Sequence, residues 1–215
     1  MIWADDGGML RVGPQSAGAD PGPACYGRGG QVPTLTDAHV IRNTVRPEAF
    51  LGGRMAIFSE RSRAVFQPIA DQLGMSLEDA ADSAVQLTNA NVGRAIQLVS
   101  TERGFDPRDY VLVPFGGAGP LHAASVASDL GIAQIVVPPS AGVISAYGLI
   151  ASDFTQFTSL TRRARVDDSA PDIVRQTYAS MAEEASARFK ALNLEGEPSV
   201  DFIADMRFVG QAFEV

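Results

Sequence analysis

A glycine cluster between two apolar runs constrains the fold of this chain more than any other feature. The first run, residues 110–115, is continuously apolar and rich in β-branched and aromatic side chains, which is typical of a strand covered on both faces. Residues 119–130 repeat apolar positions at helical spacing, with Pro120 in the first turn and Gly131 as a C-terminal cap. A second strand is predicted at 134–137. The pattern therefore predicts an α/β fold containing a strand–helix–strand unit with parallel strands.

The cluster itself comprises Gly116, Gly117, Ala118 and Gly119. Backbone with little or no side chain at the carboxyl end of a buried strand, facing a helix N-terminus, is suited to a nucleotide or phosphate. The alternative is that the glycines only allow helix and strand to pack closely, and the spacing alone does not decide between the two. A dinucleotide-binding motif is disfavoured because the third glycine is missing, and the chain has no Walker A lysine pattern.

The N-terminal region predicts a hairpin followed by an irregular loop. Residues 2–12 read as two strands joined by a tight turn, and we expect them to join the same sheet as the strand–helix–strand unit. Six glycines and three prolines in residues 13–30 exclude regular structure but permit close backbone approach. Thr34 and Asp37 then predict a capped helix over 38–43. Asp37 is alternatively a carboxylate directed at a bound cation, although capping is the commoner role.

Two consecutive helices are predicted before the glycine cluster, the second opened by Ser76 with Asp79 three residues later. Within this second helix, Asn89 and Asn91 are interpreted as facing solvent. After the second predicted strand, small and apolar residues at 142–149 predict a buried loop-to-helix segment.

The last third of the chain has a different pattern. Residues 157–166 and 200–208 have the composition or alternation of strands, and a helix begins between them near Asp172. We therefore expect residues 1–155 to form one lobe and residues 156–215 to begin a following α+β segment.

Composition narrows the function further. The net charge of -8, with scattered cations, disfavours a nucleic-acid surface. No signal segment and no run of about 18 apolar residues is present, which favours a cytoplasmic protein without a membrane span. Cys25 is the single cysteine, and with only His39 and His122 no zinc-ligand spacing exists. Cys25 is interpreted as a buried thiol rather than a nucleophile, and His122 as a structural residue.

Three motifs resemble the hydantoinase A / 5-oxoprolinase family: GPQSAGADPGPACYG at residues 13–27, TDA at 36–38 and FGGAGPLHA at 115–123. Shorter segments that fit the same family in the same order are residues 103–108, 137–139, 145–149 and 207–211. The sequence departs from the family pattern in two places, since His39 stands where Asn is usual and Arg42-Asn43 where Leu-Gly is usual.

The resemblance implies a lobe of the actin, Hsp70 and sugar-kinase type, which is ribonuclease H-like, here truncated at both ends. It implies ATP-dependent opening of cyclic amides such as hydantoins or 5-oxoproline through a phosphorylated intermediate, with Mg²⁺ or Mn²⁺. Gly116, Gly117, Ala118 and Gly119 would contact the adenosine, and Asp37 would be a weaker candidate for the outer shell of the metal. No catalytic residue is assigned.

The resemblance also implies that the chain is the carboxy-terminal part of a larger subunit and is inactive alone. Its expected partner is a hydantoinase B-type subunit or domain. Two alternatives stay open: a subunit of an ATP-dependent ketone carboxylase, which shares the fold and the use of ATP, and a non-catalytic module that docks a partner subunit.

Overall fold

The computed structural model describes residues 1–162, 165–193, 196 and 198–211. The chain separates into two compact units, Met1–Ile150 and Ala151–Val215, and each is described by itself. Among the described residues, no helix combines the length and apolar character needed to cross a membrane.

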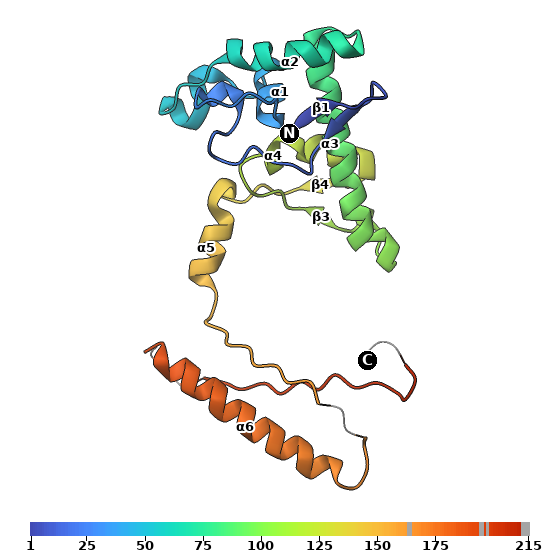
Figure 1. The fold of residues 1–215 in the computed structure, drawn as a ribbon, viewed down its shortest axis with the longest axis vertical. Coiled ribbons are helices and arrows are strands. Elements are labelled where there is room, and N and C mark those ends of the chain that lie inside the picture. Colours follow the sequence, from blue (N-terminus) through green and yellow to red (C-terminus); the bar gives the residue numbers. More distant parts are fainter. Residues whose placement is uncertain (163–164, 194–195, 197, 212–215) are drawn as a thin grey trace. The chain divides into compact units, whose positions relative to one another are not determined.

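Three helices form the main hydrophobic core of the first unit: α1 (Leu35–Ile41), α2 (Ser59–Leu73) and α3 (Leu77–Val99) (Figure 1). Phe66 of α2 is fully buried against small alanines of α3, which let the helix axes approach closely. Gly74 ends α2 in the left-handed conformation, and Ser76 caps α3 by accepting from the N–H of Asp79 at 3.0 Å. The two predicted helices and the start of the second at Ser76 and Asp79 are therefore confirmed.

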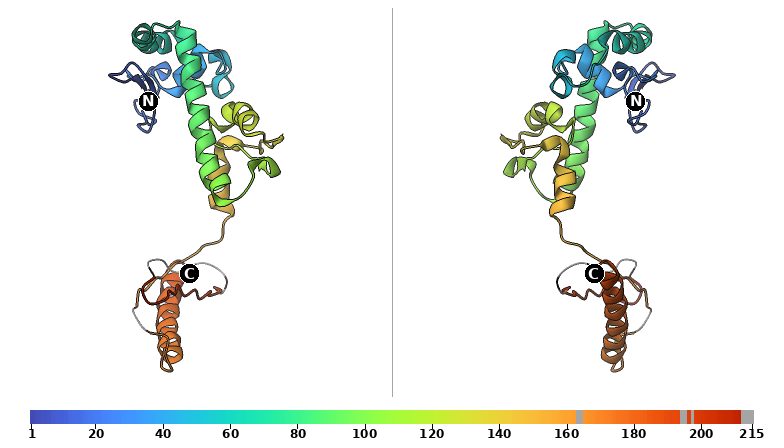
Figure 2. Two further views of the ribbon diagram at one scale, coloured as in Figure 1. Left: turned by 90° about the vertical axis from the view of Figure 1, so that its right-hand side faces the viewer. Right: turned by 90° about the vertical axis from the view of Figure 1, so that its left-hand side faces the viewer.

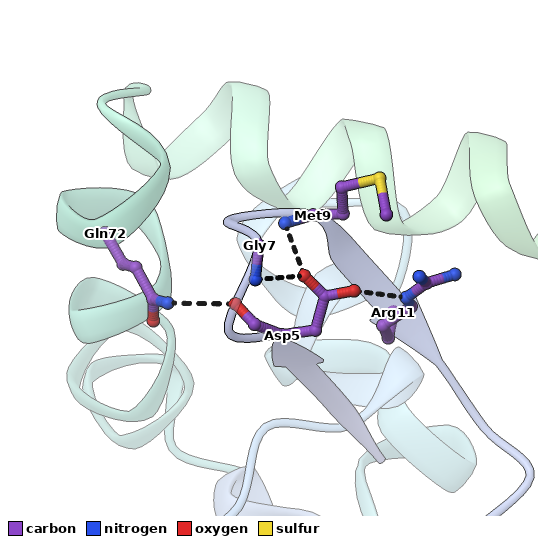
Figure 3. Close-up of polar contacts among 5 residues, drawn as sticks. All are labelled: Asp5, Gly7, Met9, Arg11 and Gln72. Carbon is purple, nitrogen blue, oxygen red and sulfur yellow. Dashed lines mark hydrogen bonds and ion pairs between the residues drawn. The ribbon is translucent and has the colours of Figure 1, made fainter.

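The hairpin consists of β1 (Ile2–Ala4) and β2 (Leu10–Val12), which pair antiparallel. Asp5 holds its turn: Oδ1 accepts from the N–H groups of Gly7 at 3.0 Å and Met9 at 2.9 Å, and Oδ2 accepts from Arg11 Nε at 2.7 Å (Figure 3). Gln72 of α2 donates to the carbonyl oxygen of Asp5 at 3.4 Å.

The expectation that the hairpin joins the second pair of strands is wrong, because the described strands form two separate two-stranded sheets. The hairpin instead packs on the helices, with Ile2 inside their core and Leu10 and Val12 against it. Burial against α2 and α3 thus determines where the hairpin lies.

The predicted strand–helix–strand unit is present as β3 (Val111–Leu112), α4 (Gly119–Leu130) and β4 (Gln134–Ile135). The strands are adjacent and parallel, as predicted, although both are shorter than the sequence indicated. The N–H of Val136 continues the pairing by donating to the carbonyl oxygen of Leu112 at 2.9 Å. Figure 2 shows the long helix α3 running from the N-terminal helices to this unit.

The apolar run of β3 is not covered on both faces by the described residues, contrary to the expectation from its composition. Val111, Val113 and Phe115 expose 44%, 49% and 58% of their surface. Helix α5 (Ile144–Ala151), expected to be buried, is also exposed apart from the half-buried Ile144. The well-packed part of the first unit is therefore the helical core rather than the β3–β4 sheet.

The second unit contains helix α6 (Ala170–Ala191), which begins two residues before the predicted start at Asp172. The strands predicted at 157–166 and 200–208 are wrong for the residues described there, and residues 163–164 lie outside the description. Phe202 instead packs on Tyr178 of α6, with ring centroids 4.7 Å apart. Alternating apolar residues make a strand only when another strand offers a partner edge.

The location of the core predicts a large loss of stability for one Phe-to-Ala change and a small loss for another. Phe66→Ala removes a fully buried ring and should lower the free energy of unfolding by about 3–5 kcal/mol. Phe115→Ala, where the ring is 58% exposed, should cost less than about 1 kcal/mol. Urea denaturation followed by circular dichroism measures both, and equal costs would contradict this description of the core.

Candidate functional site

The glycine loop, Gly116–Gly119, lies between β3 and α4 and ends at the first residue of α4. Gly116 has φ +84°, a conformation that favours glycine, and its N–H donates to the carbonyl oxygen of Ala141 at 2.8 Å. A Cβ added at Gly116 or Gly117 would meet no heavy atom within 4 Å, whereas at Gly119 it would lie 3.7 Å from Pro114. Close packing within the described structure therefore does not require glycine at 117, and the space beside it is open.

The polar groups of this loop are those of the backbone. Helix α4 is 12 residues long, its N-cap residue Ala118 provides no side-chain cap, and Pro120 lies in its first turn. No Asp, Glu, Lys or Arg occurs between Asp109 and Asp129. The loop thus offers backbone amides and the positive end of a helix dipole, which suit a polar or anionic group without a charged side chain.

An apolar groove of about 240 Å³ borders the loop on the side of α3. Its lining residues are Val92 and Ile96 of α3, residues 112–115, and Gly119, His122 and Val126 of α4. His122 is the single ionisable residue among them. The groove can accept a flat apolar group next to the polar backbone of the loop.

Asp37 lies elsewhere, at the start of α1, and is fully buried. Its Oδ1 accepts from the N–H of Cys25 at 2.9 Å and from Ser62 Oγ at 2.8 Å. Its Oδ2 accepts from the N–H groups of Thr34 at 3.0 Å and Ala24 at 3.2 Å, and from Thr34 Oγ1 at 2.7 Å. Thr34 Oγ1 in turn accepts from the N–H of Asp37 at 3.3 Å, which completes a capping box.

These contacts test whether Asp37 fits the outer shell of a metal ion. Both of its oxygens are occupied by donors of the chain itself, and none of its surface is exposed. The described residues also contain no group of three or more His, Cys, Asp or Glu able to hold a metal. Asp37 therefore fits its capping role and the fixing of loop 13–30, and its described contacts give no support to a place in the outer shell of a metal ion.

Cys25 lies within loop 13–30 and is fully buried. Burial and the neighbouring Asp37 carboxylate raise the pKa of its thiol to about 12. The thiol is therefore protonated at neutral pH and is a poor nucleophile. The interpretation of Cys25 as a buried structural thiol is confirmed.

A second buried polar cluster joins three helices. His39 Nε2 of α1 lies 3.3 Å from His122 Nε2 of α4, and His122 Nδ1 lies 2.6 Å from Asn89 Oδ1 of α3. The interpretation of Asn89 as solvent-facing is wrong, since it is buried, whereas Asn91 is exposed. Sequence reasoning missed His39 in this cluster, because 83 residues separate the two histidines and no local pattern links them.

The cluster favours neutral histidines. Burial, the neighbouring His122 and the Arg42 guanidinium lower the pKa of His39 to about 4. Burial and Arg42 also lower the pKa of His122. Arg42 forms an ion pair with Asp82, Nε to Oδ1 at 2.9 Å. Neither histidine is therefore set up to carry a proton at neutral pH.

Comparison with known proteins gives one family. The family model described as hydantoinase/oxoprolinase matches residues 1–157. The caprolactamase subunit alpha of Pseudomonas jessenii is 35% identical over 215 residues, which cover 98% of this chain and 31% of that protein.

Two solved structures are similar as well. The crystal structure of the ATP-dependent caprolactamase from Pseudomonas jessenii matches 99% of this chain and 32% of its own, with a TM-score of 0.65 and 34% identity. A nucleotide-free structure of acetone carboxylase matches 88% of this chain and 28% of its own, with a TM-score of 0.69 and 28% identity. The chain thus spans about a third of the length of these relatives.

The burial of Asp37 predicts a strong effect for Asp37→Asn. The amide would place a donor against donors that now converge on a carboxylate, so the free energy of unfolding should fall by roughly 2–4 kcal/mol. The matched control is Asp79→Asn, the same change at the same capping position of α3, where the cap is exposed and the cost should stay below about 1 kcal/mol. Urea denaturation compares the two, and similar losses would show that burial does not set the role of Asp37.

The histidine cluster predicts a specific acid sensitivity. His39 is held neutral in the fold, so the unfolded chain binds the extra proton between pH 6.5 and about 4, and folding becomes less favourable as pH falls through that window. At about 1.4 kcal/mol per pKa unit, the loss by pH 4 is about 3 kcal/mol. The variant His39→Gln cannot take up this proton. Its unfolding free energy, measured from pH 8 to 4, should fall less steeply than that of the wild type, and parallel curves would refute the assignment.

Proposed function

The chain belongs to the hydantoinase/oxoprolinase family, and from this membership we propose that it forms the adenosine-binding part of an ATP-dependent enzyme that opens cyclic amides. The proposed lobe is of the actin, Hsp70 and sugar-kinase type. Because the chain spans about a third of the length of its relatives, the full reaction is proposed for a protein of their length rather than for these 215 residues alone.

The observation that supports the site is the open space beside Gly117. A side chain there would collide with nothing in the described structure, so packing within it does not account for the glycine. We assign Gly116, Gly117, Ala118 and Gly119 to the adenosine because bulkier residues would keep a nucleotide away from the backbone. The apolar groove beside Gly119 and His122 suits the flat base, and the amides at the start of α4 suit its polar atoms.

The chemistry proposed for the whole enzyme explains why ATP is needed. An unstrained amide is a poor electrophile, and ATP supplies the phosphoryl group that turns the amide oxygen into a leaving group before water opens the ring. The residues of this chain bind and orient the nucleotide by backbone contacts. No charged side chain lies in the glycine loop to neutralise phosphate oxygens, so that task falls to other parts of the enzyme.

A ketone-carboxylase subunit is the second candidate. The similarity to acetone carboxylase, with its TM-score of 0.69, favours it, whereas the higher identity to caprolactamase favours amide hydrolysis. Both candidates use the same nucleotide site. ATP hydrolysis by a protein of the relatives' length distinguishes the two candidates. Stimulation by 5-oxoproline or hydantoin favours the amide hydrolase, and stimulation by acetone plus bicarbonate favours the carboxylase.

We also propose a hydantoinase B-type partner subunit. The names of the relatives describe subunits, as in caprolactamase subunit alpha. The exposed apolar side chains of β3 and β4 are consistent with further contacts in an assembly.

Gly117→Val tests the nucleotide site. The branched side chain fills the open space, so affinity for a fluorescent ATP analogue should fall at least about tenfold while the circular dichroism spectrum stays unchanged. Gly148→Val in α5 is the matched control, because a Cβ there also meets nothing within 4 Å, and its affinity should equal that of the wild type. Unchanged affinity in folded Gly117→Val protein would exclude this site.

A further inference from the structure

Three buried side chains from α1, α3 and α4 form one hydrogen-bonded row next to the glycine loop. His39, His122 and Asn89 expose 1%, 7% and 7% of their surface. The row connects helices that are otherwise far apart in sequence, and His122 lies only three residues after Gly119. Any change in this row therefore acts at the first turn of α4.

The hydrogen-bond partners favour one proton position on each ring. Asn89 Oδ1 accepts, so His122 Nδ1 must donate to it across 2.6 Å. His122 Nε2 is then an acceptor, and His39 Nε2–H donates to it across 3.3 Å. His39 Nδ1, buried without a hydrogen-bond partner in the described structure, is left as an acceptor. The reverse assignment would leave a buried N–H donor there instead and would require Asn89 to be flipped.

The charged groups near the row do not compete for its hydrogen bonds. Arg42, one turn after His39, pairs with Asp82 of α3 at 2.9 Å. That ion pair is partly exposed, at 33% and 39% of the two side chains. The fixed donor for His122 is therefore the ring of His39.

We propose that His39 is a positioning residue, which holds His122 in the Nδ1–H tautomer and thereby fixes the first turn of α4 and the loop Gly116–Gly119 against α1 and α3. This inference rests on the proposed function for its consequence, since a fixed loop presents its amides to the nucleotide without further ordering. The loop geometry itself does not depend on that function.

The first test needs no variant. Ring nitrogens of the ¹⁵N-labelled chain, observed by NMR at pH 7.5, should show His122 protonated at Nδ1 and His39 at Nε2. Free histidine prefers Nε2–H, so an Nδ1–H form at His122 reports the contact with Asn89 and His39. An Nε2–H tautomer at His122 would overturn the proposal.

The second test compares two variants without nucleotide. His39→Phe keeps a planar ring, slightly larger than imidazole, but removes the donor. Amide hydrogen exchange at Gly116 and Leu121, whose N–H groups donate to the carbonyl oxygens of Ala141 and Ala118, should speed up about tenfold, as expected when one buried hydrogen bond is lost. His39→Gln keeps an N–H donor near the Nε2 position and should stay within about twofold of the wild type. Equal exchange in His39→Phe and wild type would refute the positioning role.

Nucleotide binding separates this inference from the function on which it rests. Affinity for an ATP analogue should fall about tenfold in His39→Phe and be restored in His39→Gln, in step with loop exchange. A wild-type chain that binds no analogue would overturn the proposed function alone, because the tautomer and exchange measurements still decide the role of His39. Faster loop exchange with unchanged affinity would overturn the link to binding.

Discussion

The buried carboxylate of Asp37 is the interaction on which the arrangement of the first unit depends. It accepts hydrogen bonds from residues of loop 13–30, from Thr34 before α1, and from Ser62 of α2. A buried charge is tolerated only when such donors surround it. Displacing any one of the three segments therefore destabilises the packing of the other two. The Gly/Pro-rich loop, which has one short 3₁₀ turn at Ala24–Tyr26, gains its defined course from this contact.

The same short helix connects this anchor to the glycine loop. Two residues after Asp37, His39 contacts His122 in the first turn of α4, and Asn89 of α3 completes the row. Helix α1 is therefore a common support for loop 13–30 and for Gly116–Gly119. The nucleotide site proposed here uses backbone groups rather than charged side chains. Its affinity therefore depends on how firmly these helices fix the loop.

Sequence reasoning succeeded where structure follows from neighbouring residues. The caps at Ser76 and Thr34 are determined within three residues, and the strand–helix–strand unit lies within one contiguous stretch, residues 111–135. It failed where distant partners decide. The hairpin packs on helices instead of joining β3. The run at 200–208 has alternation but no partner strand among the described residues, and Asn89 is buried in contact with a histidine 33 residues away. The open space beside Gly117 is likewise visible only in the structure, because glycine spacing in the sequence fits close packing as well as it fits a nucleotide site.

The most direct test of the central claim is to map where a non-hydrolysable ATP analogue binds, by following the amide signals of the ¹⁵N-labelled chain during a titration. Binding at the proposed site should give saturable shifts concentrated at Gly116, Gly117, Ala118 and Gly119 and in the first turn of α4. Saturable shifts elsewhere, for example confined to loop 13–30, with the glycine loop unchanged would contradict it.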